Sequence, residues 1–459
     1  MQKKLMTLLC LAISFNGLGQ DRILKLDSLF SQLYKEEKFT GNVLIAENGK
    51  PIFQKSYGKA FREKNLDLNS ESVFELASIG KQFTAMGIML LKKEGKLRYE
   101  DSLRFYFPEL PYSNITIRHL LTHLSGMPDY MNLTEPYWKE RKIINNAKMI
   151  SLLAEKKPPI EFKPGERWAY SNTGYALLGS IIEKASGQSF RDFMRDRIFR
   201  PLDMRRTEVF HKRLEKRAIE NYAYGYVLDK KNNKWLMADS SEEADMVYTL
   251  DGIYGDGITN STTTDLLKWD QALYEGRLLS QEEMREAFSP AILNNGDTIN
   301  YGFGWMMDRS PDFGRYLFHS GGWPGYTTWI ERHPDSNKTI ILLANGGAAN
   351  GKITEIRNIL YGLSPRPQVE IKVDTMLLKN YTGYYLFPNN DSLRIFLEAG
   401  QLKGHAGHTT LVLLPESPQL FFVKDRDFKV RFINGDGKRQ PSLRILREGP
   451  YVEALKTGN

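Results

Sequence analysis

The chain has 459 residues, of which 41% are hydrophobic and 26% are charged. This composition excludes a disordered chain, a collagen and a coiled coil, and at ~100–200 residues per domain the length fits two to four domains. The one cysteine, Cys10, excludes an internal disulfide and any zinc or iron–sulfur site built on cysteines.

The formal net charge is +8 at pH 7, and the basic residues that produce it are dispersed along the chain. Their densest groups are short, as in residues 212–217 and 230–231. No basic stripe alternates with aromatic residues that could stack on bases. We therefore predict no binding to nucleic acid.

The first residues have the three parts of a secretory signal. Two lysines lie near the N-terminus, an apolar run covers residues 5–15, and Gly17 and Gly19 provide the small side chains that a signal peptidase needs. The apolar run is too short to cross a bilayer, and no later stretch reaches the ~18 apolar residues of a membrane-spanning helix. We predict a cleaved signal peptide over residues 1–19, a periplasmic or secreted mature protein, and no integral membrane span.

A lipoprotein signal acylated at Cys10 is the alternative. It is less favoured, because Leu9 is larger than the residue that usually precedes a lipid-bearing cysteine and few apolar residues come before it. Cleavage after residue 19 would remove both N-terminal lysines, lowering the formal charge from +8 to +6, and would leave the mature chain without cysteine.

The apolar periodicity predicts an α+β domain in the first three quarters of the chain. A helix is expected over residues 21–36, followed by a hairpin whose strands flank Asn48-Gly49. A long helical zone covers about 78–200, three strand-like runs lie within 316–345, and a last helix covers about 350–362. Strands at both ends with helices between them fit one antiparallel sheet flanked by helices.

The character of the chain changes after residue 363. Residues 364–369 begin Ser-Pro-Arg-Pro-Gln and are predicted to be a linker. From about 381 to 448, short runs such as SLRIFLE and TTLVLLP alternate with turn residues, which is typical of a small antiparallel barrel or sandwich. We predict an α+β domain over 20–363 and a β-barrel domain over 370–459.

The first segment whose side chains could take part in a reaction is Ser78-Ile79-Gly80-Lys81, at the start of a predicted helix. A serine and a lysine three residues apart share one helix face, with Cβ atoms about 5–6 Å apart. A serine hydroxyl is a weak nucleophile until a nearby base takes its proton, which a lysine amine can do. The helix N-terminus adds positive potential where an oxyanion would form. Alone, the pattern fits an N-cap serine and a surface lysine equally well.

The second segment is Tyr170-Ser171-Asn172, between a Pro-Gly turn and an apolar helix. On an extended segment alternate residues point the same way, so Tyr170 and Asn172 would face one side. A tyrosine can serve as a base close to cations, and an asparagine amide can bind a substrate carbonyl and a lysine at once. A turn that merely leads into a core helix would look the same.

The third segment, His319-Ser320-Gly321-Gly322, ends a strand-like run. Gly321 and Gly322 would let a substrate backbone lie against the strand edge, where a free N–H can serve an oxyanion hole. A structural histidine before a turn is the plain alternative.

Together, the segments resemble in kind and in order the three motifs of serine β-lactamases and penicillin-binding proteins: Ser-x-x-Lys, Tyr-x-Asn and a basic residue-x-Gly. The likeness is greatest to the branch of serine hydrolases related to class C β-lactamases, which includes esterases and D-amino-acid peptidases. It covers residues 21–362, and residues 370–459 are similar, more loosely, to the lipocalin-like barrel that often follows this domain. The blocks that carry it include FELASIGKQFTAMGIMLLKKEGKL, ITIRHLLTHLSGMPDY, FKPGERWAYSNTGYALLG, YGDGITNSTTTDLLKW and HSGGWPGY.

The resemblance implies a role for each residue of the first two motifs. Ser78 would be the acylated nucleophile, and Lys81 and Tyr170 would share the work of general base and acid. Which of the two is the working base stays open. Asn172 would orient Lys81 and the substrate.

The third motif completes the implied site and contains the main departure from the family pattern. The backbone N–H groups of Ser78 and Gly322 would form the oxyanion hole. His319 stands where β-lactamases usually have a lysine that attracts the carboxylate of the drug. A histidine is mostly uncharged at neutral pH, so carboxylate binding and cationic help for Tyr170 should both be weaker. The same histidine is frequent in esterase and peptidase members, so β-lactam hydrolysis is not expected to be the main activity.

Several aromatic residues are weaker candidates for contact with the substrate. Trp323 and Tyr326 follow the third motif and either line the substrate cleft or pack under it. The tyrosines at 222, 224 and 226 lie in a predicted loop insertion over the site.

Two pairs of histidines are close enough in sequence to be candidate metal ligands. His119 and His123 have i, i+4 spacing, but HLLTH lacks the glutamate of a zinc protease, and they are predicted to be structural. His405 and His408 are predicted to lie at a turn of the barrel. We predict no metal site and no cofactor.

The expected function is therefore that of an exported serine hydrolase that is acylated on Ser78. Its partner would be a small-molecule ester or peptide substrate, including peptides with D-amino acids. A cell-wall D,D-peptidase or a β-lactamase would share this chemistry, and a non-catalytic sensor would keep the fold without turnover. The sequence carries no indication of the oligomeric state.

Overall fold

The computed structural model describes residues 20–459 except 139, 141, 216, 365–368, 388–390, 408, 425, 427, 436–439, 447–448 and 459. The predicted signal peptide, most of the predicted linker and His408 lie outside the described residues. The chain forms two compact units, the first ending at Leu363 and the second beginning at Ser364.

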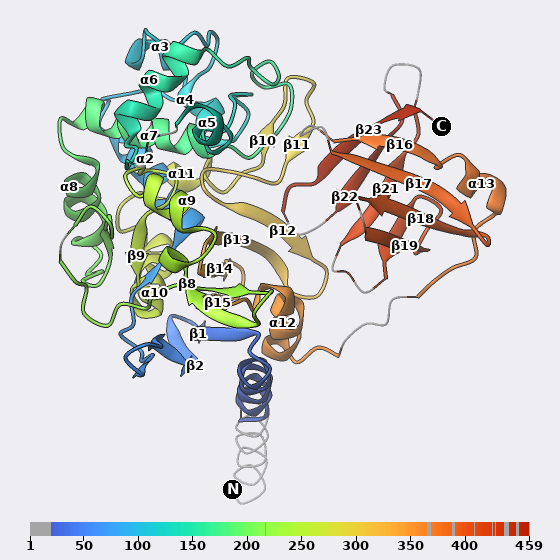
Figure 1. Ribbon diagram of the computed structural model, residues 1–459, viewed down its shortest axis with the longest axis horizontal. Helices are drawn as coiled ribbons and strands as arrows, with labels where there is room; N and C mark the ends of the chain where they lie inside the picture. The colour runs from blue at the N-terminus through green and yellow to red at the C-terminus, as the bar shows by residue number, and fades with distance from the viewer. Residues whose placement is uncertain are drawn as a thin grey trace, which may run out of the picture. The chain divides into compact units, whose positions relative to one another are not determined.

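The first unit is built on a six-stranded antiparallel sheet of order β12-β13-β14-β15-β1-β2 (Figure 1). The first long strand, β1 (Phe39–Glu47), pairs with the last, β15 (Lys338–Gly347), and on its other side with β2 (Lys50–Tyr57). The prediction of one antiparallel sheet made from both ends of this unit is confirmed. The other strands of the sheet are β12 (Met306–Ser310), β13 (Gly314–Trp323) and β14 (Tyr326–His333).

The turn between β1 and β2 follows from its two residues. Asn48 and Gly49 have φ angles of 50° and 73°. Positive φ at both central positions is what a two-residue type I′ hairpin requires, and asparagine and glycine adopt it at low cost. The predicted hairpin is therefore present.

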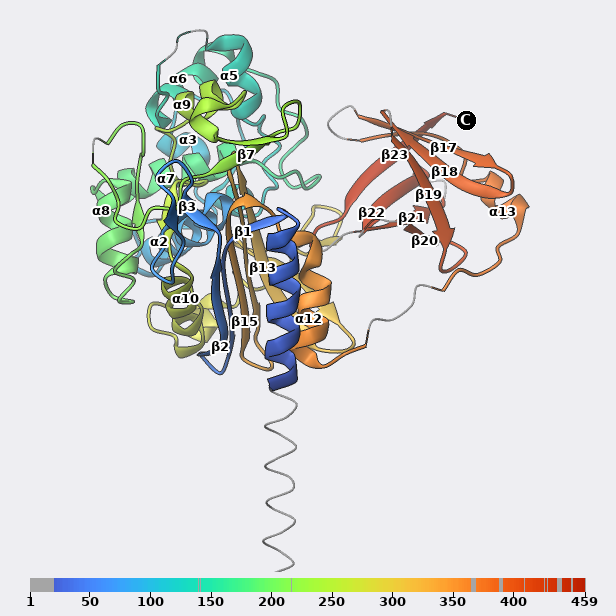
Figure 2. The same cartoon turned by 60° about the horizontal axis from the view of Figure 1, so that its bottom comes forward.

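Alternate residues of the sheet pack against different layers. On β1, Val43 and Ile45 belong to one core, whereas Leu44 and Ala46 belong to the other. The first core lies under an N-terminal helix over residues 20–35 and α12 (Ile353–Tyr361), which run side by side in Figure 2. Both helices were predicted.

The larger core contains the helices that lie between the two halves of the sheet in sequence. The longest are α2 (Lys81–Lys93), α7 (Asn172–Ser186) and α10 (Thr263–Glu275). The other helices are α3 (Leu103–Tyr106), α4 (Ile117–Leu121), α5 (Met131–Tyr137), α6 (Asn146–Lys156), α8 (Phe190–Met194), α9 (Ala244–Thr249) and α11 (Gln281–Met284). Short strands pair outside the main sheet: β3 (Lys59–Phe61), β4 (Leu66–Asp67), β5 (Phe74–Glu75), β6 (Glu208–Val209), β7 (Tyr226–Asp229), β8 (Lys234–Met237), β9 (Thr259–Ser261), β10 (Ala291–Ile292) and β11 (Thr298–Ile299).

The second unit is a closed eight-stranded barrel, which confirms the predicted β-barrel. Its strands follow one another in chain order, and the last closes antiparallel against the first. Leu393 and Ile395, two alternate residues of one strand, pack inside, where Tyr381 stacks on Phe432 with ring centroids 4.3 Å apart. The elements are α13 (Thr375–Lys379), β16 (Gly383–Leu386), β17 (Ser392–Glu398), β18 (Gln401–Ala406), β19 (Thr409–Pro415), β20 (Leu420–Val423), β21 (Lys429–Ile433), β22 (Ser442–Leu446) and β23 (Val452–Gly458).

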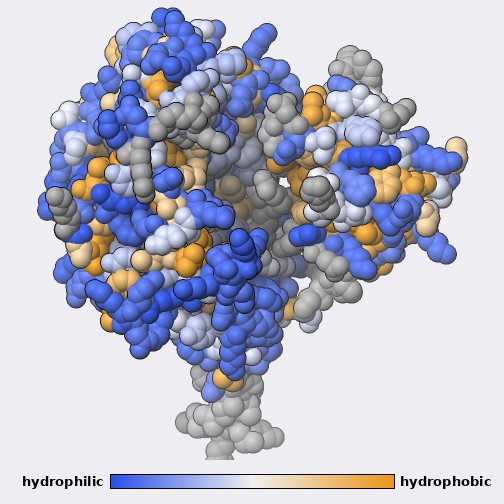
Figure 3. Space-filling model, in the orientation of Figure 1, coloured by the Kyte–Doolittle hydropathy of each residue, from blue (hydrophilic) through white to orange (hydrophobic). Residues whose placement is uncertain are grey.

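The visible surface is mostly polar. In Figure 3, hydrophilic residues cover most of the face shown, and hydrophobic ones are scattered among them in small groups. Within the part of the chain that the structure describes, no helix combines the length and the apolar character needed to cross a bilayer.

A buried ion pair fixes α12 to the sheet. The Arg357 guanidinium donates to both carboxylate oxygens of Glu331 on β14, at 2.7 and 2.5 Å, and neither side chain is more than 3% exposed. Burial alone would raise the pKa of Glu331, but the charge and hydrogen bonds of Arg357 hold it down, to about 2. The pair is therefore ionised at neutral pH.

Replacing one partner of this pair should destabilise the first unit strongly. Arg357→Met leaves the Glu331 carboxylate buried without its counter-ion, so we expect a loss of about 3–5 kcal/mol in the free energy of unfolding. Urea unfolding followed by tryptophan fluorescence measures it. The double variant Arg357→Met/Glu331→Gln removes the stranded charge and should regain part of the loss. A single variant as stable as the wild type would contradict this prediction.

Candidate active site

Ser78 lies on a single 3₁₀ turn, η1 (Ala77–Gly80), that leads directly into α2. It is not an N-cap, because the residue in that position is Leu76 and no side chain caps the turn. Ala77 has a φ of 49°, in the left-handed region that residues with a Cβ rarely adopt. Such strain persists only where the surroundings hold it, and it often marks a functional position. The Leu76 carbonyl on one side of this turn accepts a hydrogen bond of 2.8 Å from the Thr328 hydroxyl.

Lys81 begins α2, and its amine is fully buried. Its Nζ lies 3.2 Å from Ser78 Oγ, 2.9 Å from Asn172 Oδ1 and 2.7 Å from the backbone carbonyl oxygen of Asp256. The structure thus brings Ser78, Lys81 and Asn172 of the first two motifs into one hydrogen-bonded group. A helical serine–lysine pair three residues apart, as expected, shares one face.

The amide of Asn172 is oriented by a residue that the sequence analysis missed. Asp129 Oδ2 accepts hydrogen bonds from the Asn172 backbone N–H at 2.8 Å and from its Nδ2 at 3.1 Å. Because the carboxylate takes the NH₂ group, the Oδ1 atom must face Lys81. Asp129 lies in ITIRHLLTHLSGMPDY, one of the sequence blocks that resemble the family. Its place in that block was the only feature of the sequence that could have indicated a role in the site.

The third acceptor of Lys81 comes from the stretch 254–261, which the sequence analysis did not connect with the site. Thr84 donates to the Gly255 carbonyl at 2.6 Å, and Tyr130 donates to the Asp256 carboxyl at 2.8 Å. Burial raises the pKa of this carboxyl. The two bonds hold the segment so that the Asp256 carbonyl points at the Lys81 amine.

Tyr170 lies against the same lysine. Lys81 Nζ is 4.9 Å from the centroid of its ring, and among the described residues none forms a hydrogen bond with its buried hydroxyl. Tyr170 and Asn172 both face Lys81, as expected, although Asn172 does not lie on an extended segment. Ser171 caps α7, accepting a hydrogen bond from Gly174 N–H, so Asn172 is already the first helical residue.

The third motif lies on β13 beside the η1 turn. Strand β12 pairs only with residues 314–318 of β13, so in the described chain no strand pairs with that side of residues 319–323. Gly321 has no Cβ, and one added there would lie 2.2 Å from the Leu76 carbonyl oxygen. A Cβ on Gly322 would meet nothing within 4 Å. The close approach of β13 to the turn that holds Ser78 therefore depends on Gly321, and Gly322 lies beside open space.

His319 is a buried, neutral residue. Its Nδ1 lies 2.7 Å from the Ser320 carbonyl oxygen, which only accepts, so Nδ1 carries the proton. Its Nε2 lies 3.2 Å from the hydroxyl of Tyr301, which can then donate to it. Burial, and after it the positive charge of Lys81, lowers the pKa of His319 to about 3. The expectation that the third motif lacks a cation at neutral pH agrees with this environment.

A sequence profile of the Beta-lactamase family matches residues 26–361. The chain belongs to the Beta-lactamase family. It is 40% identical over 449 residues to penicillin-binding protein 4* of Bacillus subtilis (strain 168), which covers 95% of this chain and 99% of the relative. The family resemblance predicted from the motifs is confirmed.

Solved structures of penicillin-binding proteins and related proteins share this fold. The octameric penicillin-binding protein homologue from Pyrococcus abyssi is 25% identical, with a TM-score of 0.64 over 94% of this chain and 99% of that chain. D-amino acid amidase from Ochrobactrum anthropi SV3, complexed with D-phenylalanine, is 26% identical, with a TM-score of 0.58 over 75% of this chain and 97% of that chain.

The aromatic candidates around the Beta-lactamase motifs are mainly packing residues. Tyr326 is buried in the larger core and donates to the Ala223 carbonyl at 2.7 Å, whereas Trp323 is half-buried at the end of β13.

In the group of three tyrosines at 222–226, Tyr222 and Tyr226 are also buried. Tyr224 is half-buried and stacks on Phe61 at 4.3 Å. Of the aromatic candidates, Trp323 and Tyr224 keep exposed surface.

The two histidines of HLLTH have different environments. His119 forms a capping box with Thr116 at the start of α4. His123 lies buried against Tyr170, with ring centroids 4.3 Å apart. In the barrel, His405 is exposed and lies 3.1 Å from the Thr410 hydroxyl. Among the described residues, no group of three or more His, Cys, Asp or Glu side chains is arranged to hold a metal ion.

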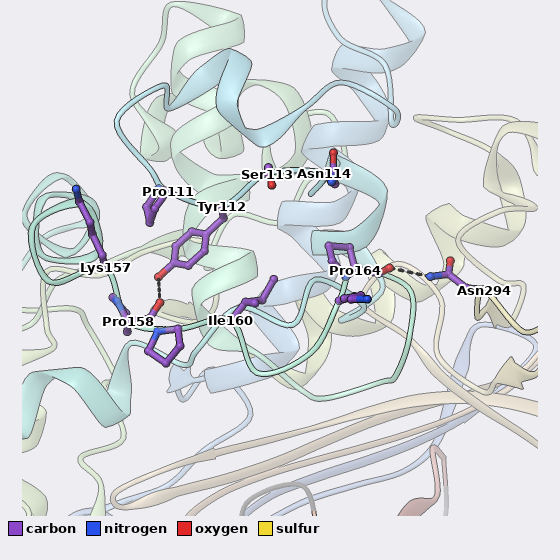
Figure 4. Close-up of a pocket in the computed structure, with 11 residues that line it drawn as sticks. Pro111, Tyr112, Ser113, Asn114, Lys157, Pro158, Ile160, Pro164 and Asn294 are labelled. Carbon is purple, nitrogen blue, oxygen red and sulfur yellow. Dashed lines mark hydrogen bonds between the residues drawn. The ribbon is translucent and has the colours of Figure 1, made fainter. Parts of the chain in front are cut away.

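A surface hollow of about 580 Å³ is separate from the motif residues (Figure 4). Tyr112 donates to the Pro158 carbonyl at 3.1 Å and Asn294 to the Pro164 carbonyl at 2.9 Å, so polar groups of its wall bond to one another. The predicted site residues do not line it. It is therefore no part of the candidate active site.

The pKa of His319 leads to a prediction about activity. Between about pH 5 and 8, where an ordinary histidine titrates, a group with a pKa of about 3 stays neutral throughout. His319→Gln should therefore leave the shape of the pH dependence of kcat/KM unchanged over this range, whatever its effect on the rate. Hydrolysis of a p-nitrophenyl ester measures it, with His405→Gln as the control. An ionisation near pH 6 that disappears only in His319→Gln would contradict the assignment.

Proposed function

We propose that this protein is a serine hydrolase that is acylated on Ser78 by small esters or short peptides, including peptides with D-amino acids. One observation carries the proposal: the amine of Lys81 is fully buried and has Ser78 Oγ as one of three neighbours. The other two, an amide oxygen and a backbone carbonyl oxygen, can only accept hydrogen bonds.

This arrangement suits Lys81 to the role of general base. A neutral amine has two N–H bonds and one lone pair. With both N–H groups directed at Asn172 and the Asp256 carbonyl, the lone pair points at Ser78 Oγ. When Ser78 attacks a carbonyl carbon, its proton moves to Lys81 while the C–O bond to the serine forms. The open edge of β13 beside Ser78 supports a place for the substrate, with the N–H groups of Ser78 and Gly322 as oxyanion donors.

Tyr170 fits the second half of the reaction. Its hydroxyl is buried and unpartnered among the described residues, and Lys81 lies against its ring. We assign it to proton transfer with the leaving group: Tyr170 gives its hydroxyl proton to the leaving group as the bond from the acyl carbon breaks, and it regains a proton from Lys81. Water then attacks the ester on Ser78 and gives a proton to Lys81, which passes a proton to Ser78 Oγ as the ester bond breaks and the acid leaves.

The neutral His319 supports uncharged substrates over carboxylate-bearing ones. An uncharged, buried imidazole attracts a carboxylate only weakly, whereas esters and amides need no cation at this position.

The similarity to an amidase that was solved with D-phenylalanine supports D-amino-acid amides or peptides as substrates. Similarity to penicillin-binding protein 4* supports a second candidate, a D,D-peptidase of the cell wall. The predicted signal peptide supports export to the periplasm or the medium.

The nucleophile can be tested by labelling. A fluorophosphonate probe should label the wild type, and Ser78→Ala should abolish labelling and lower kcat about 10³-fold or more, since it removes the attacking hydroxyl. Ser289→Ala is the matched control, because its hydroxyl only donates to the Arg285 carbonyl at the end of a helical turn. Full turnover by Ser78→Ala would overturn the mechanism. Absence of any labelling or acylation burst in the wild type would favour a non-catalytic sensor.

The substrate class can be tested with a panel. Neutral p-nitrophenyl esters and D-aminoacyl amides should show a higher kcat/KM than nitrocefin, which carries a carboxylate, because His319 supplies no charge to hold it. Cleavage of D-Ala-D-Ala peptides with long-lived labelling by penicillin would instead favour the D,D-peptidase. A kcat/KM for nitrocefin above that for every ester would make the protein a β-lactamase.

A further inference from the structure

His123 lies against Tyr170 and has no role in the function described so far. It follows α4 and is buried, with 1% of its surface exposed. We propose that His123 is a positioning residue that holds Tyr170 in place for proton transfer. This inference rests on the proposed function, since it assigns His123 to the same reaction.

The backbone and the ring of His123 hold the chain on both sides of Tyr170. The His123 carbonyl accepts a hydrogen bond of 3.1 Å from the N–H of Ala169. Its Nδ1 accepts another, also of 3.1 Å, from the N–H of Ser171. Tyr170 lies between these two anchors, and its ring centroid is 4.3 Å from that of His123. One residue thus determines both the path of the segment and the position of the ring.

The hydrogen bond to Ser171 also determines the protonation state of His123. A backbone N–H only donates, so Nδ1 must carry a lone pair, and the proton of the neutral ring is on Nε2. Burial lowers the pKa of His123 well below its ordinary value, and the positive charge of Lys81 lowers it further. The ring therefore stays uncharged beside Tyr170.

The backbone of His123 is strained in the way that positioning residues often are. Its φ is 59°, a left-handed value that few residues other than glycine adopt, although histidine, asparagine and aspartate adopt it more often than the rest. The surrounding contacts hold it there: besides Tyr170, the ring lies 4.6 Å from that of Tyr301 and 5.2 Å from that of Tyr175. The conformation places Nδ1 within reach of Ser171.

His119 in the same segment provides the matched control. It caps α4 through Thr116, is half-buried and shows none of the ring contacts with Tyr170 that His123 makes. Replacing it should change the stability of the helix and leave the reaction alone. The two histidines of HLLTH are therefore separable by experiment.

The test compares His123→Ala, His123→Asn and His119→Ala with the wild type in the hydrolysis of a D-aminoacyl amide, whose leaving group must be protonated. His123→Ala removes the acceptor for Ser171, so kcat should fall on the order of 10–100-fold, the effect of a misplaced reacting group, with KM within about threefold of the wild type. Asparagine tolerates positive φ and offers an oxygen near the position of Nδ1, so His123→Asn should recover kcat to within about fivefold. His119→Ala should keep the kcat of the wild type.

Melting temperatures are measured for all four proteins, so that a folding defect is recognised. If His123→Ala does not fold, His123→Asn decides: a folded protein with kcat within fivefold of the wild type supports the inference, and one that loses tenfold or more overturns it. Equal loss in folded His123→Ala and His123→Asn also overturns it, as does a change in KM alone. A wild type without activity toward the amide would instead count against the proposed function.

Discussion

A lysine amine cannot be buried in a protein without partners, and the first unit is organised by this constraint at Lys81. Its three partners come from segments far apart in the chain: the η1 turn, the first residue of α7 and the carbonyl of Asp256. Leaving any of the three positions empty would cost free energy, because a polar group in the interior has no water to replace a lost partner. The requirement to satisfy one amine therefore determines where three elements meet.

Further polar groups hold those partners in turn. Asp129 holds the amide of Asn172 in one orientation, and Tyr130, the next residue, bonds the Asp256 carboxyl. Two neighbouring residues of one loop thus hold two of the three partners of Lys81 in position. Around Tyr170, the histidines His123 and His319 are neutral and carry their protons on different nitrogens, each determined by a backbone neighbour. The two imidazoles therefore add no positive charge to this part of the site.

Much of the fold could be predicted because its signals are local. The Asn48-Gly49 turn, the alternation on the strands and the Ser78–Lys81 spacing all depend on residues close in sequence. The parts that could not be predicted depend on distant contacts. The Asp256 carbonyl accepts a hydrogen bond from a lysine 175 positions away, and no spacing in the sequence predicts that contact. The neutrality of His319 depends likewise on burial that exists only once β13 is in place. The extended segment expected at Asn172 is absent, because Ser171 caps α7 and Asn172 is the first residue of that helix.

The pairing of β1 with β15 has a consequence for how the protein is made. Phe39 lies opposite Gly347, so two neighbouring inner strands of the sheet join residues separated by 308 positions. Closing so long a loop is slow, and a ribosome must have synthesised nearly the whole first unit before β1 can meet β15. Until then β1 and β2 can form a hairpin, but its apolar edge has no neighbour. The barrel differs, since each of its strands pairs with the next in sequence apart from the single closure of β23 on β16. The strand pairs of the barrel can therefore form one after another while the chain is being made, whereas the first unit cannot complete its sheet until β15 has been synthesised.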